Sequence, residues 1–127
     1  MQLEGIDFFE TYAPVVQWTT VRLMLILEVL LGLKSNQGDV TAAFIHADLE
    51  EGKNVFVDMS KGFEQYAKNG CKKVLKLKKT LYGLCQSPRA FWKYLTEKMK
   101  ACDMHQSKFD PASLLERRSC ALFMLMI

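Results

Sequence analysis

The sequence predicts an α+β fold, and three observations carry that prediction. Side chains alternate in direction over 54–59, as in a half-buried strand, with Val55, Val57 and Met59 on one face and Phe56 and Asp58 on the other. Lys73–Leu77 forms a second short run, typical of an edge strand protected by lysines. Ser87-Pro88 is typical of a helix start, with serine as the cap and proline in the first turn. Such elements pack around one antiparallel or mixed sheet.

The first third of the chain predicts an irregular segment followed by a helix. Residues 1–18 are expected to be irregular, and Thr19 or Thr20 can cap a helix that continues to Leu33, with Gly32 near its end. The apolar run is too short for a membrane span and contains Glu28, and no basic segment precedes it as in a signal peptide. We therefore expect a buried helix.

The remaining elements follow from shorter signals. A short strand at Gln37–Thr41 should lead into a turn or short helix over Ala42–Leu49, and 60–71 should be a loop. The helix from Ser87 should run to about Cys102. Its expected buried face comprises Phe91, Leu95, Met99 and Cys102. Asp110-Pro111 should break the chain, and the apolar run 121–127 has strand character.

Composition indicates one domain or part of one. The chain has 127 residues, of which 50% are hydrophobic, so a packed core is expected and disorder is not. Charge is uneven: residues 1–60 carry a net −6 and residues 61–100 a net +9. Two readings stay open, namely two solvated faces of unequal charge, or a metal-binding side and a phosphate-binding side.

Cysteine and histidine spacing argues against a zinc site. The four cysteines form no Cys-x-x-Cys pair and the two histidines are isolated. Reduced, partly buried thiols in an intracellular protein are the simplest interpretation.

Five ordered blocks resemble one family. They are FFETYAPVVQWTTVRLML (8–25), QGDVTAAFIHADLEE (37–51), NVFVDMSKGF (54–63), KVLKLKKTLYGLCQSPRAFW (73–92) and QSKFDPA (106–112). In this order and spacing they are similar to the reverse transcriptase domain of Ty1/copia-type retrotransposon polyproteins. The resemblance implies a single partial domain over 1–127, with fingers-like residues at about 1–36 and palm-like residues at about 37–127 that include an inserted fingers segment. It also implies a palm sheet backed by helices.

The resemblance implies a two-magnesium nucleotidyl transferase site. Magnesium takes oxygen ligands, so such a site needs carboxylates and a carbonyl. By position, Asp39 corresponds to the first catalytic, metal-binding aspartate, and the backbone carbonyl of Val40 to a further ligand. From the residues alone, a turn or cap acid after Gly38 is the preferred interpretation of Asp39.

The same resemblance implies a nucleotide-binding set. Phe44 would exclude a 2′-hydroxyl sterically, with small Ala43 beside it, although core packing is the usual fate of a phenylalanine. Tyr82, Gly83 and Gln86 would lie against the nascent base pair. Arg22 would hold the triphosphate, or else pair with Glu28.

Nucleic-acid contacts are implied around the second basic block. Ser87 and Arg89 lie at a helix start, which offers N–H groups to anions. Lys76, Lys78 and Lys79 could follow a phosphate backbone or simply form a solvated strand face. The implied partners are an RNA or DNA template-primer and a deoxynucleoside triphosphate.

One departure from the family pattern bears on activity. The tyrosine–x–aspartate–aspartate hairpin that supplies the other metal carboxylates does not occur in these residues, so the chain reads as truncated before it. The remaining polyprotein domains are also absent, and we expect a catalytically incomplete chain. The alternatives are a non-catalytic nucleic-acid-binding fragment and a functionless transposon relic. We expect an intracellular location, either in a cytoplasmic virus-like particle or in the nucleus, with no membrane association.

Overall fold

A computed structural model describes residues 2–3, 5, 8–50, 52–116 and 122–124. In chain order the elements are α1 (Trp18–Leu31), the 3-10 helix η1 (Ala43–His46), β1 (Phe56–Asp58), β2 (Val74–Lys76), α2 (Ser87–Ala101), β3 (Met104–Gln106), β4 (Ser113–Glu116) and β5 (Leu122–Met124). These helices and the two small antiparallel sheets that the strands form confirm the α+β class, whereas the expectation of one sheet is wrong.

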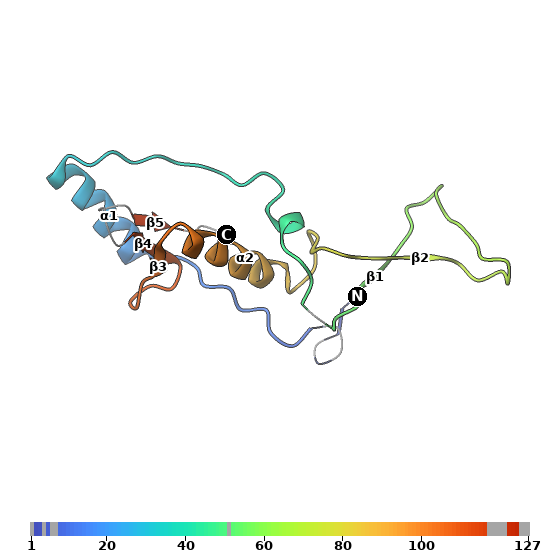
Figure 1. Cartoon of the computed structure of the whole chain (residues 1–127). Coiled ribbons are helices and arrows are strands. Elements are labelled where there is room, and N and C mark those ends of the chain that lie inside the picture. The colour runs from blue at the N-terminus through green and yellow to red at the C-terminus, as the bar shows by residue number, and fades with distance from the viewer. Residues whose placement is uncertain (1, 4, 6–7, 51, 117–121, 125–127) are drawn as a thin grey trace.

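The two sheets lie in different parts of the molecule. β1 pairs with β2 in the register Val57↔Leu75, and this hairpin projects from the body at the end opposite α1 (Figure 1). β3, β4 and β5 form an antiparallel meander beside α2. The predicted alternation over 54–59 is confirmed, because Val55, Val57 and Met59 are half-buried while Phe56 and Asp58 are exposed.

α2 carries the core. Phe91 and Leu95 are buried with Ala47 and Ala90, and Met99 packs against this cluster. Cys102, predicted to be buried, is exposed because it lies past the last turn as the C-cap. The N-cap is Gln86 and not Ser87, whose fully buried hydroxyl donates to the Leu81 carbonyl at 2.6 Å.

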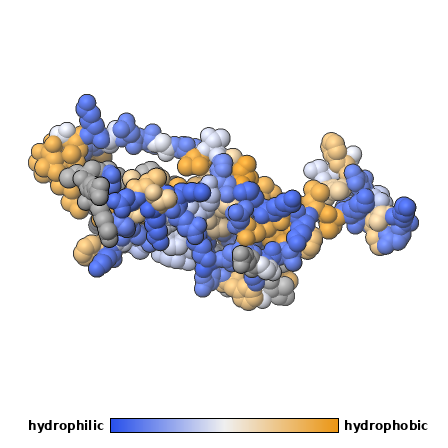
Figure 2. Space-filling view, in the orientation of Figure 1, coloured by the Kyte–Doolittle hydropathy of each residue, from blue (hydrophilic) through white to orange (hydrophobic). Residues whose placement is uncertain are grey.

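α1 ends as predicted but is not buried. Gly32 adopts φ +63° as the C-cap, which only glycine adopts without strain, and its N–H donates to the Glu28 carbonyl. The cap predicted at Thr19 or Thr20 is wrong, since the N-cap is Gln17, two or three residues earlier. No residue of α1 is fully buried, although one stripe along it is half-buried, and its exposed apolar side chains form the hydrophobic surface at that end in Figure 2.

The strand predicted at Gln37–Thr41 is wrong. Residues 33–40 are exposed and irregular, and they run from the end of α1 across to η1 (Figure 1). A strand needs a neighbour for its backbone groups, and none of the described strands pairs with this segment. The short helix predicted within Ala42–Leu49 is confirmed as η1, and the C-terminal strand is confirmed over Leu122–Met124, while 121 and 125–127 lie outside the described residues.

Two further predictions concern the burial of the cysteines and the membrane-spanning capacity of the helices. Cys71, Cys85 and Cys102 are free and exposed, so their predicted partial burial is wrong, and Cys120 lies outside the described residues. None of the described helices combines the length and apolar character that crossing a membrane requires.

Candidate functional site

The junction between η1 and α2 brings together aromatic side chains from distant blocks. The Phe44 ring lies 4.7 Å from the Tyr82 ring and 6.1 Å from the Phe91 ring, measured between centroids. Phe44 and Ala43 pack on the core beneath η1, whereas Tyr82 is 59% exposed. One side of this aromatic group is therefore core and the other faces solvent, a surface on which a flat ring or a sugar can rest.

Residues 81–87 form the turn that leads into α2, and the conformation of this turn accounts for Gly83 and Ser87. Gly83 has φ +92°, in the region that favours glycine. The Ser87 N–H donates to the Leu84 carbonyl at 3.2 Å, and its hydroxyl holds Leu81. Ser87 is thus an internal brace, and its hydroxyl is not open to a nucleic acid in this structure.

Gln86 connects this turn to the N-terminal segment. Its side chain is 8% exposed, and its Oε1 accepts a hydrogen bond from Gln2 Nε2 at 2.9 Å. The Oε1 of Gln2 in turn accepts the Cys85 N–H at 2.9 Å. The predicted nucleotide-facing amide is therefore occupied by another part of the chain.

Arg89 is held between two carboxylates. Its guanidinium donates to Glu10 on the N-terminal segment and to Glu50 after η1, and its side chain is 17% exposed. Lys93, one turn along α2, donates to Glu50 at 2.9 Å. This hydrogen bond from Lys93 lowers the pKa of Glu50 despite opposition from partial burial, and the charges of Lys93 and Arg89 add to the effect.

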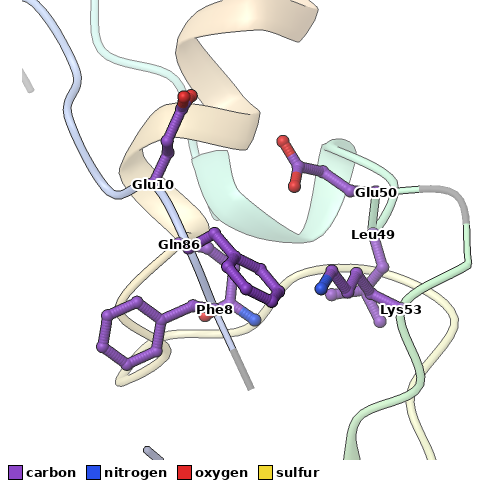
Figure 3. A pocket seen from close by; sticks show the side chains of 7 residues that line it. Phe8, Glu10, Leu49, Glu50, Lys53 and Gln86 are labelled. Atoms are coloured by element: carbon purple, nitrogen blue, oxygen red, sulfur yellow. The ribbon is translucent and has the colours of Figure 1, made fainter. Parts of the chain in front are cut away.

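A shallow pocket lies beside this ion-pair group (Figure 3). Its lining consists of Phe8, Phe9, Glu10, Leu49, Glu50, Lys53 and Gln86. The Lys53 ammonium lies 3.8 Å from the centre of the Phe9 ring, a cation–π contact. Sequence reasoning missed Glu10, Glu50 and Lys53 as parts of this region.

The signal that could have found these acids is the charge asymmetry. Five ion pairs found in the described residues each link a Lys or Arg from 61–100 to an acid from 1–60. Lys72–Asp58 at 3.5 Å and Lys79–Asp48 at 3.1 Å are two examples. Part of the excess charge in the acidic and basic segments therefore forms ion pairs within the fold. This differs from both interpretations of the charge pattern, namely solvated faces or metal-binding and phosphate-binding sides.

The lysines of the second basic block divide into engaged and open charges. Lys79 contacts Asp48 and donates to the His46 carbonyl at 3.2 Å. Lys76 and Lys78 are exposed, and none of the side-chain hydrogen bonds or ion pairs found in the described residues involves them. Lys76 ends β2 and Lys78 follows it by two residues, so the two positive charges lie close together in the sequence.

The residues predicted for metal and triphosphate lie outside the aromatic group. Asp39 and Val40 are exposed in the irregular segment between α1 and η1. Nowhere in the described residues do three His, Cys, Asp or Glu side chains gather as a metal site would require. A lone carboxylate and a neighbouring carbonyl do not fit a magnesium site, since magnesium demands a near-octahedral set of oxygen ligands.

Arg22 is exposed on α1 and does not form the alternative ion pair with Glu28. Glu28 instead accepts a hydrogen bond from the Ser35 hydroxyl at 2.7 Å. Residues six apart on a helix point to different faces, which explains why the pair does not form.

Comparison with known proteins gives a consistent result. The family of reverse transcriptases (RNA-dependent DNA polymerases) matches residues 1–116. The chain is 37% identical over 126 residues to the retrovirus-related Pol polyprotein from transposon TNT 1-94 of Nicotiana tabacum, covering 99% of the chain and 9% of that protein. It is 32% and 30% identical over 125 residues to the Pol polyproteins from transposons RE1 and RE2 of Arabidopsis thaliana, covering 98% of the chain and 8% of each.

The chain thus spans about a tenth of the length of the curated relatives it matches. No solved structure matches it.

Proposed function

Because the chain belongs to the reverse transcriptase (RNA-dependent DNA polymerase) family, we propose that it supplies the fingers-like part (about 1–36) and much of the palm-like part (about 37–127) of a copia-type enzyme. The activity would be RNA-templated DNA synthesis during retrotransposition, inside the cell. The observation that carries the proposal is the match along nearly the whole chain to Pol polyproteins from transposons.

The nucleotide face of this proposal is the aromatic group at the η1–α2 junction. Phe44 and Tyr82 come from separate blocks and meet at 4.7 Å, and the exposed side of Tyr82 is available to a base or sugar. Ala43 leaves room beside Phe44, whose ring would collide with a 2′-hydroxyl. Gly83 and Gln86 support the turn that carries Tyr82, and Arg22 would approach the triphosphate from α1.

The proposed catalytic carboxylate is Asp39, with the Val40 carbonyl beside it. Reverse transcriptases generally depend on magnesium, but these residues alone do not fit a magnesium site. The aspartate pair that the family places in its hairpin does not occur in these 127 residues. We therefore propose that the chain contributes one carboxylate and does not catalyse nucleotide addition on its own.

A second candidate function is binding of nucleic acid without catalysis. The exposed Lys76, at the end of β2, and Lys78, two residues beyond it, favour this function, because open charges close together can neutralise successive phosphates. Lys79 and Arg89 would join them only after exchanging their carboxylate partners for phosphates. Ser87 would contribute by bracing the start of α2 beneath them.

A magnesium-dependent primer-extension assay tests the proposed function. The 127-residue chain and its Asp39→Asn variant are compared on an RNA template with a DNA primer. We expect no incorporation by either. Incorporation by the chain that Asp39→Asn abolishes would show that these residues suffice for catalysis and would overturn the proposal of incompleteness.

Retention of an RNA–DNA hybrid at several salt concentrations tests the binding candidate. Replacing Lys76 and Lys78 by glutamine should reduce the slope of log affinity against log salt by about 2, because two phosphate contacts are lost. Lys34→Gln with Lys108→Gln is a matched control, since both are exposed lysines away from the hairpin. Equal slopes in all variants would exclude the hairpin, and a chain without a cooperative melting transition would favour the relic.

A further inference from the structure

Asp110 lies at the turn between β3 and β4 and is 3% exposed. Its Oδ1 accepts the Ala112 N–H at 3.1 Å, which holds the turn into β4. Its Oδ2 accepts the backbone N–H of Gln17 at 3.0 Å, and the Thr20 side chain hydrogen-bonds to the same carboxylate. One buried side chain therefore joins the sheet turn to the beginning of α1.

The groups that Asp110 meets are those that a helix start leaves unsatisfied. Gln17 is the N-cap of α1, and its side chain makes no cap hydrogen bond. In a capping box, an acid or amide three positions into the helix reaches back to the N-cap N–H. That position holds Thr20, and Asp110 makes the same hydrogen bond from a distant part of the sequence. Its negative charge also suits the positive end of the helix dipole.

The attachment matters because α1 has little else to hold it. No residue of α1 is fully buried and only one stripe along it is half-buried, so packing of its side chains holds it less firmly than it holds α2. A connection at the first turn sets where the helix starts and how it points away from β3 and β4.

We propose that Asp110 is a positioning residue, whose carboxylate fixes the first turn of α1 to the β3–β4 turn and thereby orients Arg22. The role of Arg22 rests on the proposed function, whereas the attachment of α1 by Asp110 does not. Arg22 follows Thr20 by two residues and lies within the next turn of the helix, so its direction depends on how that first turn is held.

The ionisation of Asp110 agrees with this role. Burial alone would raise the pKa of its carboxyl, but hydrogen bonds from Thr20, Gln17 and Ala112 outweigh burial and lower the pKa. Ser113, which follows in β4, donates its N–H to the Asp110 carbonyl at 2.9 Å. None of these four neighbours is titratable, so any acid-dependent loosening at this point belongs to Asp110.

Backbone amide exchange in the whole chain tests the attachment. Asp110→Asn and Thr20→Val should each speed exchange in the first turn of α1 by about 2- to 30-fold, the range expected for a lost cap. Exchange in α2 and in the β1–β2 hairpin should be unchanged. The double variant should exchange no faster than the more affected single variant, since both remove one interaction. Thr20→Ser, which keeps the hydroxyl, should behave as wild type.

The control for charge removal is Asp103→Asn, an exposed acid at the other end of β3. The wild-type advantage over Asp110→Asn should also disappear as the pH falls through the carboxyl titration, a dependence that a purely steric role would not show. Unchanged first-turn exchange in Asp110→Asn, or additive effects with Thr20→Val, would overturn the attachment. Asp110→Asn keeps the side-chain shape, so it decides the matter even if Asp110→Ala fails to fold.

The orientation of Arg22 by Asp110 is tested by a separate measurement. Binding of a deoxynucleoside triphosphate should weaken equally in Asp110→Asn and Arg22→Gln, and no further in the double variant. If neither change affects binding while first-turn exchange responds as expected, the role of Arg22 fails and the attachment stands. If Arg22→Gln weakens binding and Asp110→Asn does not, Asp110 does not orient Arg22, but the proposed role of Arg22 in binding the triphosphate stands.

Discussion

The two long helices have nearly equal length and opposite environments. α1 (14 residues) is apolar almost all round, yet none of its side chains is buried. α2 (15 residues) alternates charged and apolar residues, and five of its residues are buried. The apolar content of a helix therefore does not decide whether it is buried here. What decides is whether another described element lies against it, and η1 and β3 do so for α2 alone.

The helices are also fastened by different forces. α2 is held by packing of Phe91 and Leu95 and by the ion pairs of Arg89 along its exposed side. α1 is held at its first turn by hydrogen bonds to Asp110. Substitutions along α2 should therefore lower stability, whereas substitutions along α1 beyond its first turn should not.

The largest expected effect is that of Phe91→Ala. Phe91 is 4% exposed at the centre of the core, so its removal should lower the free energy of unfolding by about 3–5 kcal/mol. Urea unfolding followed by far-UV circular dichroism measures the change. Phe63→Ala is the control, because Phe63 is 77% exposed and its loss should leave the midpoint nearly unchanged. Equal losses in both variants would mean that the core is not centred on α2.

A smaller loss is expected for Arg89→Gln. The change removes the charge that joins Glu10 and Glu50, but these carboxylates are largely exposed and recover solvation, so about 1–2 kcal/mol should be lost. Urea unfolding measures this change, and limited proteolysis should show earlier cleavage near Glu10. The control is Arg22→Gln, which should alter stability by less than about 0.5 kcal/mol. A neutral Arg89→Gln would show that the ion pairs add nothing in solution.

Acid should weaken both the ion pairs of α2 and the attachment of α1 to Asp110. The expected loss of stability is smaller than that for Arg89→Gln. The pKa values of Glu50 and Asp110 are lowered from their ordinary 4.5 and 3.8. Each carboxyl therefore binds fewer protons when folded than when unfolded. Its contribution to stability is complete above the ordinary pKa and is lost as the pH falls through the lowered one. The urea midpoint should fall less steeply with acid in Glu50→Gln and in Asp110→Asn than in wild type, and identical slopes would contradict this.

Local signals predicted the local features of the fold. The positive φ at Gly32, the proline in the first turn of α2 and the alternation over 54–59 all depend on neighbours in sequence. The strand expected at Gln37–Thr41 depends on a pairing partner, which no local pattern reveals. The predicted cap of α1 is wrong for the same reason, because the residue that accepts the hydrogen bond from the Gln17 N–H, Asp110, lies far away in the sequence.

In the candidate site, too, contacts between residues that are distant in the sequence could not be predicted from local patterns. The resemblance predicts Phe44 and Tyr82 from different blocks, and the structure brings their rings together. The charge of Arg89 predicts a role for this residue, but its carboxylate partners follow only from pairing the acidic part of the chain with the basic part. The role of Asp39 remains a prediction, since the described residues do not assemble the carboxylates that would test it.

The smallest expected effect is that of Leu30→Gln on α1. Leu30 is 73% exposed, and leucine and glutamine have similar helix propensities, so the free energy of unfolding should change by less than about 0.5 kcal/mol. Leu95→Gln is the matched change on α2, where Leu95 is 8% exposed, and it should lower the free energy of unfolding by about 1–3 kcal/mol because it buries an amide. A loss above about 1.5 kcal/mol for Leu30→Gln, far beyond the usual range for a surface change, would show that α1 is covered in solution. Repeating the measurement at two protein concentrations then separates the sources of that cover, because only a second copy makes stability concentration-dependent.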